Sequence, residues 1–427
     1  MLVPARANRI GPFAVTIALL SSLVARLPQT RVHDGSANPS AFLDTTCEYV
    51  PIAALHNSEI EHVVDPAYHA WLRPRVHPFN RAAVVCYPAQ RTGPLPLHVY
   101  SHGDMMLLLN EADRERYFQR ASDGRLLLDP KQHHPVFAYL RQLAEFGFAA
   151  VAHLSCEYGC QYGSANFLDV LEVFLHFEGT GAAHLAGLVN HSAPYSVSGL
   201  SAGSRAVMIL AALRDTPSYL SAAPALASRI RPAHRATIAR IGAVIAFHPD
   251  SMFEVAPSPL QTEMDGKMYG VRADGSLRYP YPFNPDIGHY QVGSMPMLFV
   301  TGTDDMIQPL GSAWSSAFAP LSTPDRVFLN VAGAKHELGA GYAAAAAHFA
   351  RAFALRSREE LAFIYGDARG STPPLAALLP LAGAGARNNG GLEGEVDFLA
   401  CRRDGDAAPF ALRRYCEPAA ARYSSSR

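Results

Sequence analysis

The stretch Tyr195-Ser-Val-Ser-Gly-Leu-Ser-Ala-Gly-Ser-Arg205 decides the fold class of this chain. Its centre, Gly199-Leu-Ser201-Ala-Gly203, is a Gly-x-Ser-x-Gly pattern that follows a strand-like pattern starting at Tyr195 and precedes a helix-like pattern starting at Ala202. We therefore predict that Ser201 lies on a sharp turn from a strand into a helix, where the flanking glycines relieve crowding and the hydroxyl stays exposed. The alternative interpretation is a plain glycine-rich turn.

Apolar runs and helix-like stretches alternate on both sides of this turn. The predicted strands are Ala82–Tyr87, Leu95–Ser101, Phe148–Ser155, Tyr195–Gly199, Ile241–Phe247, Met297–Thr301 and Arg326–Ala332. The predicted helices are Val136–Phe146, Phe167–Phe177, Ala202–Leu213 and Tyr342–Leu355. Most of the runs are continuously apolar, as in parallel strands covered on both faces. The sequence thus predicts an α/β fold with a mostly parallel central sheet flanked by helices.

The regular pattern extends over residues 81–356, which we predict to form one α/β domain. Within it, residues 251–294 are rich in Pro, Tyr, Gly and Asp and form an insert between two strands. Such an insert is either a lid over the site or a plain surface excursion. Residues 27–80 are an N-terminal segment, and residues 357–427 are a C-terminal extension to which the sequence assigns no role.

The first 26 residues are typical of a secretory signal peptide. Arg6 and Arg9 precede a short apolar stretch from Phe13 to Ala25, and a basic start before such a stretch marks a secretory signal. An Arg-rich organelle transit peptide is the alternative. The stretch is shorter than the roughly 20 apolar residues that span a bilayer. We therefore expect a secreted protein with no integral membrane segment in the mature chain.

Composition excludes two classes of protein. Apolar residues make up 49% of the chain and charged residues 17%, which is incompatible with a mainly disordered chain. The 36 Lys and Arg residues nearly balance the 37 Asp and Glu residues. Because nucleic-acid binding needs a surplus of cations on one face, no nucleic-acid partner is expected.

An even number of cysteines favours disulfides in an oxidising compartment. The six are Cys47, Cys86, Cys156, Cys160, Cys401 and Cys416. A tight turn could bring Cys156 and Cys160 together, and a bond between Cys401 and Cys416 would close a C-terminal loop. A metal site at the Cys-x3-Cys pair is the alternative, although no second pair lies close by in the sequence.

Polar residues stand at the ends of two strands downstream of Ser201. Asp305 ends the run Val-Thr-Gly-Thr-Asp-Asp, and His336 ends the run Val-Ala-Gly-Ala-Lys-His. A serine nucleophile needs a base and a carboxylate that orients the base. The chain order Ser201, Asp305, His336 is the order found with a serine on a strand-to-helix turn. Asp304 and Asp250 are the alternatives for the acid.

The turn His102-Gly103-Asp104 follows an upstream strand. We predict that the main-chain amides of Asp104 and Ala202 bind a developing oxyanion, because the donors come from such a loop and from the residue after the nucleophile. The Asp104 carboxylate has to turn away from the oxyanion, since its charge would oppose it. His102 is interpreted as a structural hydrogen-bonding residue rather than a base.

With these motifs, the chain from about residue 81 to residue 355 resembles the α/β-hydrolase superfamily. The Tyr-Ser-His-Gly strand end and the Gly-Thr-Asp-Asp turn look like the branch of dienelactone hydrolases, platelet-activating-factor acetylhydrolases, chlorophyllases and secreted polyester hydrolases. The resemblance implies a serine esterase without cofactor or metal, in which Ser201 is the nucleophile, His336 the base and Asp305 its orienter. Two features depart from that branch: the longer separation from Ser201 to Asp305, and the acidic Asp104.

The expected activity is hydrolysis of a small-molecule or lipid-like carboxylic ester through an acyl-enzyme intermediate. The triad does not fix the acyl group, so a peptidase or lactonase on the same scaffold is an alternative. A catalytically inactive, hydrolase-like binding protein is the alternative from a different class.

Overall fold

The computed structural model describes residues 44–55, 81–103, 115–155, 166–179, 183–215, 230–249, 293–305, 321, 323–365, 374–379 and 398–401. The chain divides into two compact units, residues 1–42 and 43–427, and every described residue belongs to the second. The predicted signal peptide, the predicted oxyanion donor Asp104, the alternative acid Asp250 and nearly all of the 251–294 insert lie outside the described residues.

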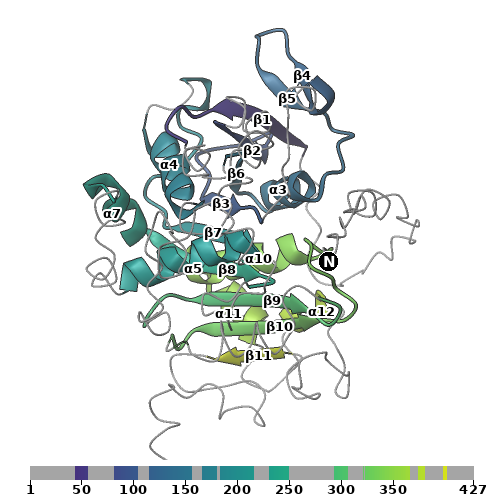
Figure 1. The fold of residues 1–427 in the computed structure, drawn as a ribbon, viewed down its shortest axis with the longest axis vertical. Coiled ribbons are helices and arrows are strands. Elements are labelled where there is room, and N and C mark those ends of the chain that lie inside the picture. The colour runs from purple at the N-terminus through teal and green to yellow at the C-terminus, as the bar shows by residue number, and fades with distance from the viewer. Residues whose placement is uncertain are drawn as a thin grey trace, which may run out of the picture. The chain divides into compact units, whose positions relative to one another are not determined.

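An 11-stranded sheet organises the described part of the chain, in the order β11-β10-β9-β8-β7-β3-β6-β2-β1-β5-β4 (Figure 1). The strands are β1 (Thr45–Pro51), β2 (Ala82–Pro88), β3 (Leu97–Ser101), β4 (Phe118–Arg120), β5 (Leu126–Leu128), β6 (Ala149–His153), β7 (Tyr195–Leu200), β8 (Ile241–Phe247), β9 (Met297–Gly302), β10 (Arg326–Val331) and β11 (Phe398–Cys401). The consecutive strands from β10 to β6 in this order pair in parallel, and antiparallel strands extend the sheet on both sides.

Helices cover both faces of the sheet. They are α3 (Pro135–Glu145), α4 (Asn166–Glu178), α5 (Ala202–Asp215), α7 (Pro232–Ala239), α10 (Tyr342–Phe353), α11 (Arg358–Tyr365), α12 (Pro374–Ala377) and the short η4 (Ala183–Leu185). Side chains of α4, α5 and α7 share one hydrophobic cluster with the sheet, and those of α3, α10 and α11 share the other. The prediction of an α/β architecture with a mostly parallel central sheet is confirmed.

Local sequence accounts for where two of the helices, α3 and α10, begin. Helix α3 begins with Pro135, whose fixed backbone suits a first helical position, and His134 Nδ1 accepts a hydrogen bond from the Val136 amide. Helix α10 begins after Gly341, whose φ of 84° favours glycine, and continues through an alanine-rich stretch of high helix propensity. No helix in the described ranges is long and apolar enough to cross a membrane.

The sheet extends beyond the predicted 81–356 domain at both ends. Strand β1 lies in the predicted N-terminal segment and pairs antiparallel with β2. Strand β11 lies in the predicted C-terminal extension and pairs antiparallel with β10. Helix α12 also lies in that extension, and its Leu375 is buried in the same cluster as α10. Both flanking segments therefore contribute to the packed fold.

One disulfide joins the first two strands. Cys47 of β1 and Cys86 of β2 face each other in the antiparallel register, with their Cα atoms 4.0 Å apart, and they form a disulfide. The expectation of disulfides is confirmed for this pair. Cys156, Cys160 and Cys416 lie outside the described residues, and of Cys401 only the backbone, in β11, is described.

We expect this disulfide to stabilise the folded state measurably. Replacing both Cys47 and Cys86 by alanine should lower the free energy of unfolding in urea by about 2–4 kcal/mol, because the bond closes a loop across a sequence separation of 39 residues. Reducing the Cys47–Cys86 bond should lower the free energy of unfolding of the natural protein by a similar amount. The double variant lacks this bond, so a reducing agent should cause no such loss in it. Six titratable thiols in denatured, unreduced protein would contradict the prediction.

Candidate active site

Ser201 occupies a strained turn between β7 and α5. Its φ of 54° lies in the left-handed region, which residues other than glycine seldom adopt. The flanking glycines make the turn feasible: a Cβ on Gly199 would lie 2.1 Å from the Gly203 carbonyl oxygen, and a Cβ on Gly203 would lie 2.1 Å from that of Ser101. The structure therefore has the sharp strand-to-helix turn that the Gly-x-Ser-x-Gly pattern predicts.

We expect Gly203→Ala to destabilise the protein by about 1–3 kcal/mol, because the backbone of two elements must move to admit one methyl group. Gly93→Ala is the matched control, since no atom lies within 4 Å of a Cβ at that position. Urea unfolding of the two variants measures the difference. Equal stability of both variants would show that the packing around the turn tolerates a side chain.

The turn at His102 and Gly103 lies directly against the serine. A Cβ on Gly103 would be 2.9 Å from the Leu200 carbonyl oxygen and 3.1 Å from Ser201 Cβ. The His102 ring is buried, with Nδ1 3.0 Å from the Gly103 carbonyl oxygen and Nε2 3.0 Å from the Ser155 carbonyl oxygen. Burial lowers its pKa. Both ring nitrogens thus face the backbone, which is the arrangement of a structural histidine.

Ala202, the second predicted oxyanion donor, is the first residue of α5 and is buried. The first amides of a helix have no partner within the helix, and the helix dipole gives this end a partial positive charge. An anion next to Ser201 would therefore meet a favourable field. Asp104, the other predicted donor, follows Gly103 but lies outside the described residues.

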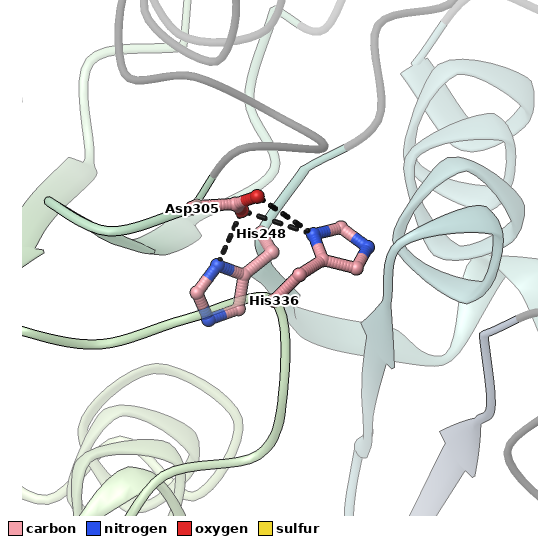
Figure 2. Close-up of side chains that lie close together, drawn as sticks. All are labelled: His248, Asp305 and His336. Carbon is pink, nitrogen blue, oxygen red and sulfur yellow. Dashed lines mark hydrogen bonds and ion pairs between the residues drawn. The ribbon is translucent and has the colours of Figure 1, made fainter. Parts of the chain in front are cut away.

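A hydrogen-bonded pair stands at the ends of β9 and β10. His336 Nδ1 lies 2.9 Å from Asp305 Oδ2 and 3.1 Å from Asp305 Oδ1, so the imidazole donates to this carboxylate (Figure 2). Asp305 is buried, whereas the neighbouring Asp304 is exposed and its Oδ1 accepts a hydrogen bond from the Thr303 hydroxyl. The structure therefore brings Asp305, and not Asp304, to His336.

The parallel sheet places the serine at the same edge as this pair. Strands β7, β8, β9 and β10 are parallel neighbours, so the residues after their carboxyl ends share one edge. The Ser201 amide donates to the Phe247 carbonyl oxygen at 3.1 Å, and the next residue, His248, contacts Asp305. A continuous series of contacts thus runs from the serine turn to the His336 pair.

Between Ser201 and His336 the described residues show no hydrogen bond. In Figure 2 the Nε2 atom of His336 points away from Asp305, and 13% of the side chain is exposed. In substrate-free enzymes the bond from base to nucleophile is often long and shortens only when substrate is bound. Among the described residues no hydrogen bond involves this nitrogen, so it can take a proton from a nearby hydroxyl.

His248 is a site residue that the sequence reasoning missed. It follows β8, its φ is 44°, and its side chain is fully buried. Its Nδ1 lies 2.7 Å from Asp305 Oδ2, and its Nε2 lies 3.0 Å from the Tyr342 hydroxyl. A histidine directly after a strand, at the edge that carries Ser201, was the available signal. The sequence analysis considered only Asp250, two residues further on.

Two imidazoles and a carboxylate are also ligand types for transition metals. Ligating atoms of His248, Asp305 and His336 lie within 4.8 Å of one another. Each Nδ1 is, however, within direct hydrogen-bonding distance of the carboxylate, at 2.7 Å and 2.9 Å. A cation could enter only after both Nδ1 protons had left, and the hydrogen bonds account for the geometry without one.

Comparisons of the sequence with protein-family models and with curated proteins find no match. The class of the protein therefore has to be argued from its fold and from the geometry at this edge of the sheet.

Proposed function

We propose that this chain is a serine hydrolase of the α/β-hydrolase type that cleaves carboxylic esters through an acyl-enzyme intermediate. One observation carries the proposal: a buried carboxylate, Asp305, holds the imidazole of His336 at the same sheet edge as Ser201, which has the strained backbone of a nucleophile turn. The chain order of the three residues fits the same class.

Each residue has one role in the proposed reaction. His336 Nε2 takes the proton of the Ser201 hydroxyl as the oxygen attacks the ester carbonyl carbon. Asp305 accepts a hydrogen bond from the Nδ1–H of His336 throughout, which keeps Nε2 free to accept the serine proton and stabilises the imidazolium that forms. His336 then gives the proton to the leaving alcohol, and water repeats the sequence to release the acid.

Main-chain amides bind the oxyanion in the proposed reaction. The amide of Ala202 at the start of α5 is the donor that the described residues contain, and the amide of Asp104 is the second donor expected from the sequence. Such donors act on charge that develops only in the transition state, which is why they accelerate the reaction. The proposed substrate is a small-molecule or lipid-like ester.

A fluorophosphonate probe tests the proposal directly, because it forms a covalent bond only with an activated serine. We expect labelling at Ser201, located by peptide mass spectrometry, together with hydrolysis of p-nitrophenyl esters. Ser201→Ala should abolish labelling, whereas Ser192→Ala, at an exposed serine whose hydroxyl donates a hydrogen bond to Asn190, should not. An unlabelled Ser201 in folded protein would favour the alternative, an inactive binding protein.

A further inference from the structure

The carboxylate of Asp305 is shared by two histidines. His336 Nδ1 contacts Oδ2 at 2.9 Å, and His248 Nδ1 contacts the same oxygen at 2.7 Å (Figure 2). The roles proposed above use only His336. His248 is a buried titratable residue, and its Nε2 lies 3.0 Å from the hydroxyl of Tyr342. The roles proposed above assign it no function.

The hydrogen bonds fix where the protons are. A carboxylate only accepts, so His248 Nδ1 carries a proton and donates it to Asp305. Burial lowers the pKa of His248, which favours a neutral ring with a single N–H. Its Nε2 then accepts from Tyr342, a phenol that stays protonated because burial and the nearby charges of Asp305 and Glu337 raise its pKa.

Within the described residues, the groups that face His248 come from the segments after β9 and β10 and from α10. Asp305, after β9, raises the pKa of His248 through its hydrogen bond and its charge, and the backbone carbonyl of Glu337 acts in the same direction. His336 lowers the pKa of His248 by charge repulsion. Tyr342 of α10 completes the surroundings. Burial is the largest of these effects, and its direction is downward.

Tyr342 also links this network to the loop that carries His336. It is the first residue of α10, directly after residues 332–341, and is itself buried. Its ring stacks on Phe247 with centroids 5.1 Å apart and lies 5.8 Å from the ring of His248. Tyr342 thereby holds the C-terminal end of the loop that carries His336 against His248.

We propose that His248, supported by Tyr342, is a positioning residue that orients Asp305 and weakens its attraction for the imidazolium of His336. This inference rests on the proposed function. Each donor to a carboxylate stabilises its negative charge and leaves less of that charge for other partners. With two donors on Asp305, the imidazolium of His336 is stabilised less by this carboxylate than it would be with one donor.

Three variants separate this role from a merely structural one. His248→Leu removes the donor, and we expect the acidic limb of the kcat/KM profile to move up by about one pH unit. His248→Asn keeps a donor, because Asn Nδ2 can take the place of Nδ1 and asparagine tolerates a left-handed φ. It should restore the natural profile. Tyr342→Phe should move the limb by about half a pH unit in the same direction.

Tyr100→Phe is the matched control. Tyr100 is fully buried in the same hydrophobic cluster as Tyr342, and its hydroxyl has no hydrogen-bond partner among the described residues. Losing this hydroxyl should leave the profile unchanged. Two results would overturn the proposal. One is an acidic limb that moves as far in Tyr100→Phe as in Tyr342→Phe, and the other is an acidic limb that moves neither in His248→Leu nor in Tyr342→Phe. Because Tyr342→Phe removes one atom, it remains a test if His248→Leu does not fold.

The titration of His336 can also be followed without activity. In protein with 13C-labelled histidine, the His336 resonance is assigned by its loss in His336→Gln, and its midpoint is read by NMR in each variant. If the natural protein hydrolyses no ester but the midpoint moves as described, the proposed function fails and the coupling stands. If esters are hydrolysed and the midpoint stays fixed, the coupling fails and the proposed function stands.

Discussion

Ser201→Ala should lower kcat/KM for p-nitrophenyl acetate by about 10⁴-fold or more, and His336→Ala should do the same. In the proposed reaction the serine supplies the bond-forming oxygen, and without the imidazole its hydroxyl would have no base to take the proton. Because the two residues act as one unit, the double variant should be hardly slower than either single variant.

The control for these losses is His133→Ala, which removes an exposed histidine from the segment before α3. It should keep full activity. Circular dichroism and urea unfolding should show that all of the variants are folded. Losses of Ser201→Ala and His336→Ala that multiply in the double variant would mean that the two residues act independently, and the triad assignment would then be wrong.

Asp305→Asn should have the second largest effect, a loss of about 10³-fold or more. The natural carboxylate accepts hydrogen bonds from both His336 and His248. An amide has one accepting oxygen and one donating NH₂ group, so it cannot accept from both rings in the same way. Either ring can be forced into the other tautomer, and if His336 is the one that changes, its Nε2 no longer accepts the serine proton.

Asp304→Asn is the matched control for Asp305→Asn. It makes the same change of charge one residue earlier, at an exposed side chain that contacts Thr303. We expect its kcat/KM to remain within about threefold, because a screened surface charge contributes little. A large loss at Asp304 with none at Asp305 would reverse the assignment of the acid. Loss at neither would leave Asp250 as the alternative.

The central elements could be predicted because each carries its signal locally. Strands β8 and β9 are almost continuously apolar, as burial on both faces of a sheet requires, whereas β7 alternates apolar residues with serines and ends in the Gly-x-Ser-x-Gly pattern. The observed bounds of these strands agree with the predicted ones to within a residue. Ser201, Asp305 and His336 could be proposed as site residues in the same way, because they lie one, three and five residues after the ends of β7, β9 and β10.

The elements that were missed depend on partners far away in the sequence. Strand β1, Thr-Thr-Cys-Glu-Tyr-Val-Pro, is partly polar, and it becomes a strand by pairing with β2. The same holds for β11, which has only four residues and pairs with β10. His248 lies 57 residues from Asp305 and 94 from Tyr342, so no sequence pattern joins the three.

The strand order also determines when the site can exist. Ser201 follows β7, whereas His336 follows β10, and the two intervening strands, β8 and β9, lie between them in the sheet. Parallel neighbours cannot be joined by a tight turn, and contacts between distant segments of a chain form slowly. A nascent chain therefore carries the proposed nucleophile long before the proposed base, and the three proposed site residues come together only when the last parallel strand has formed.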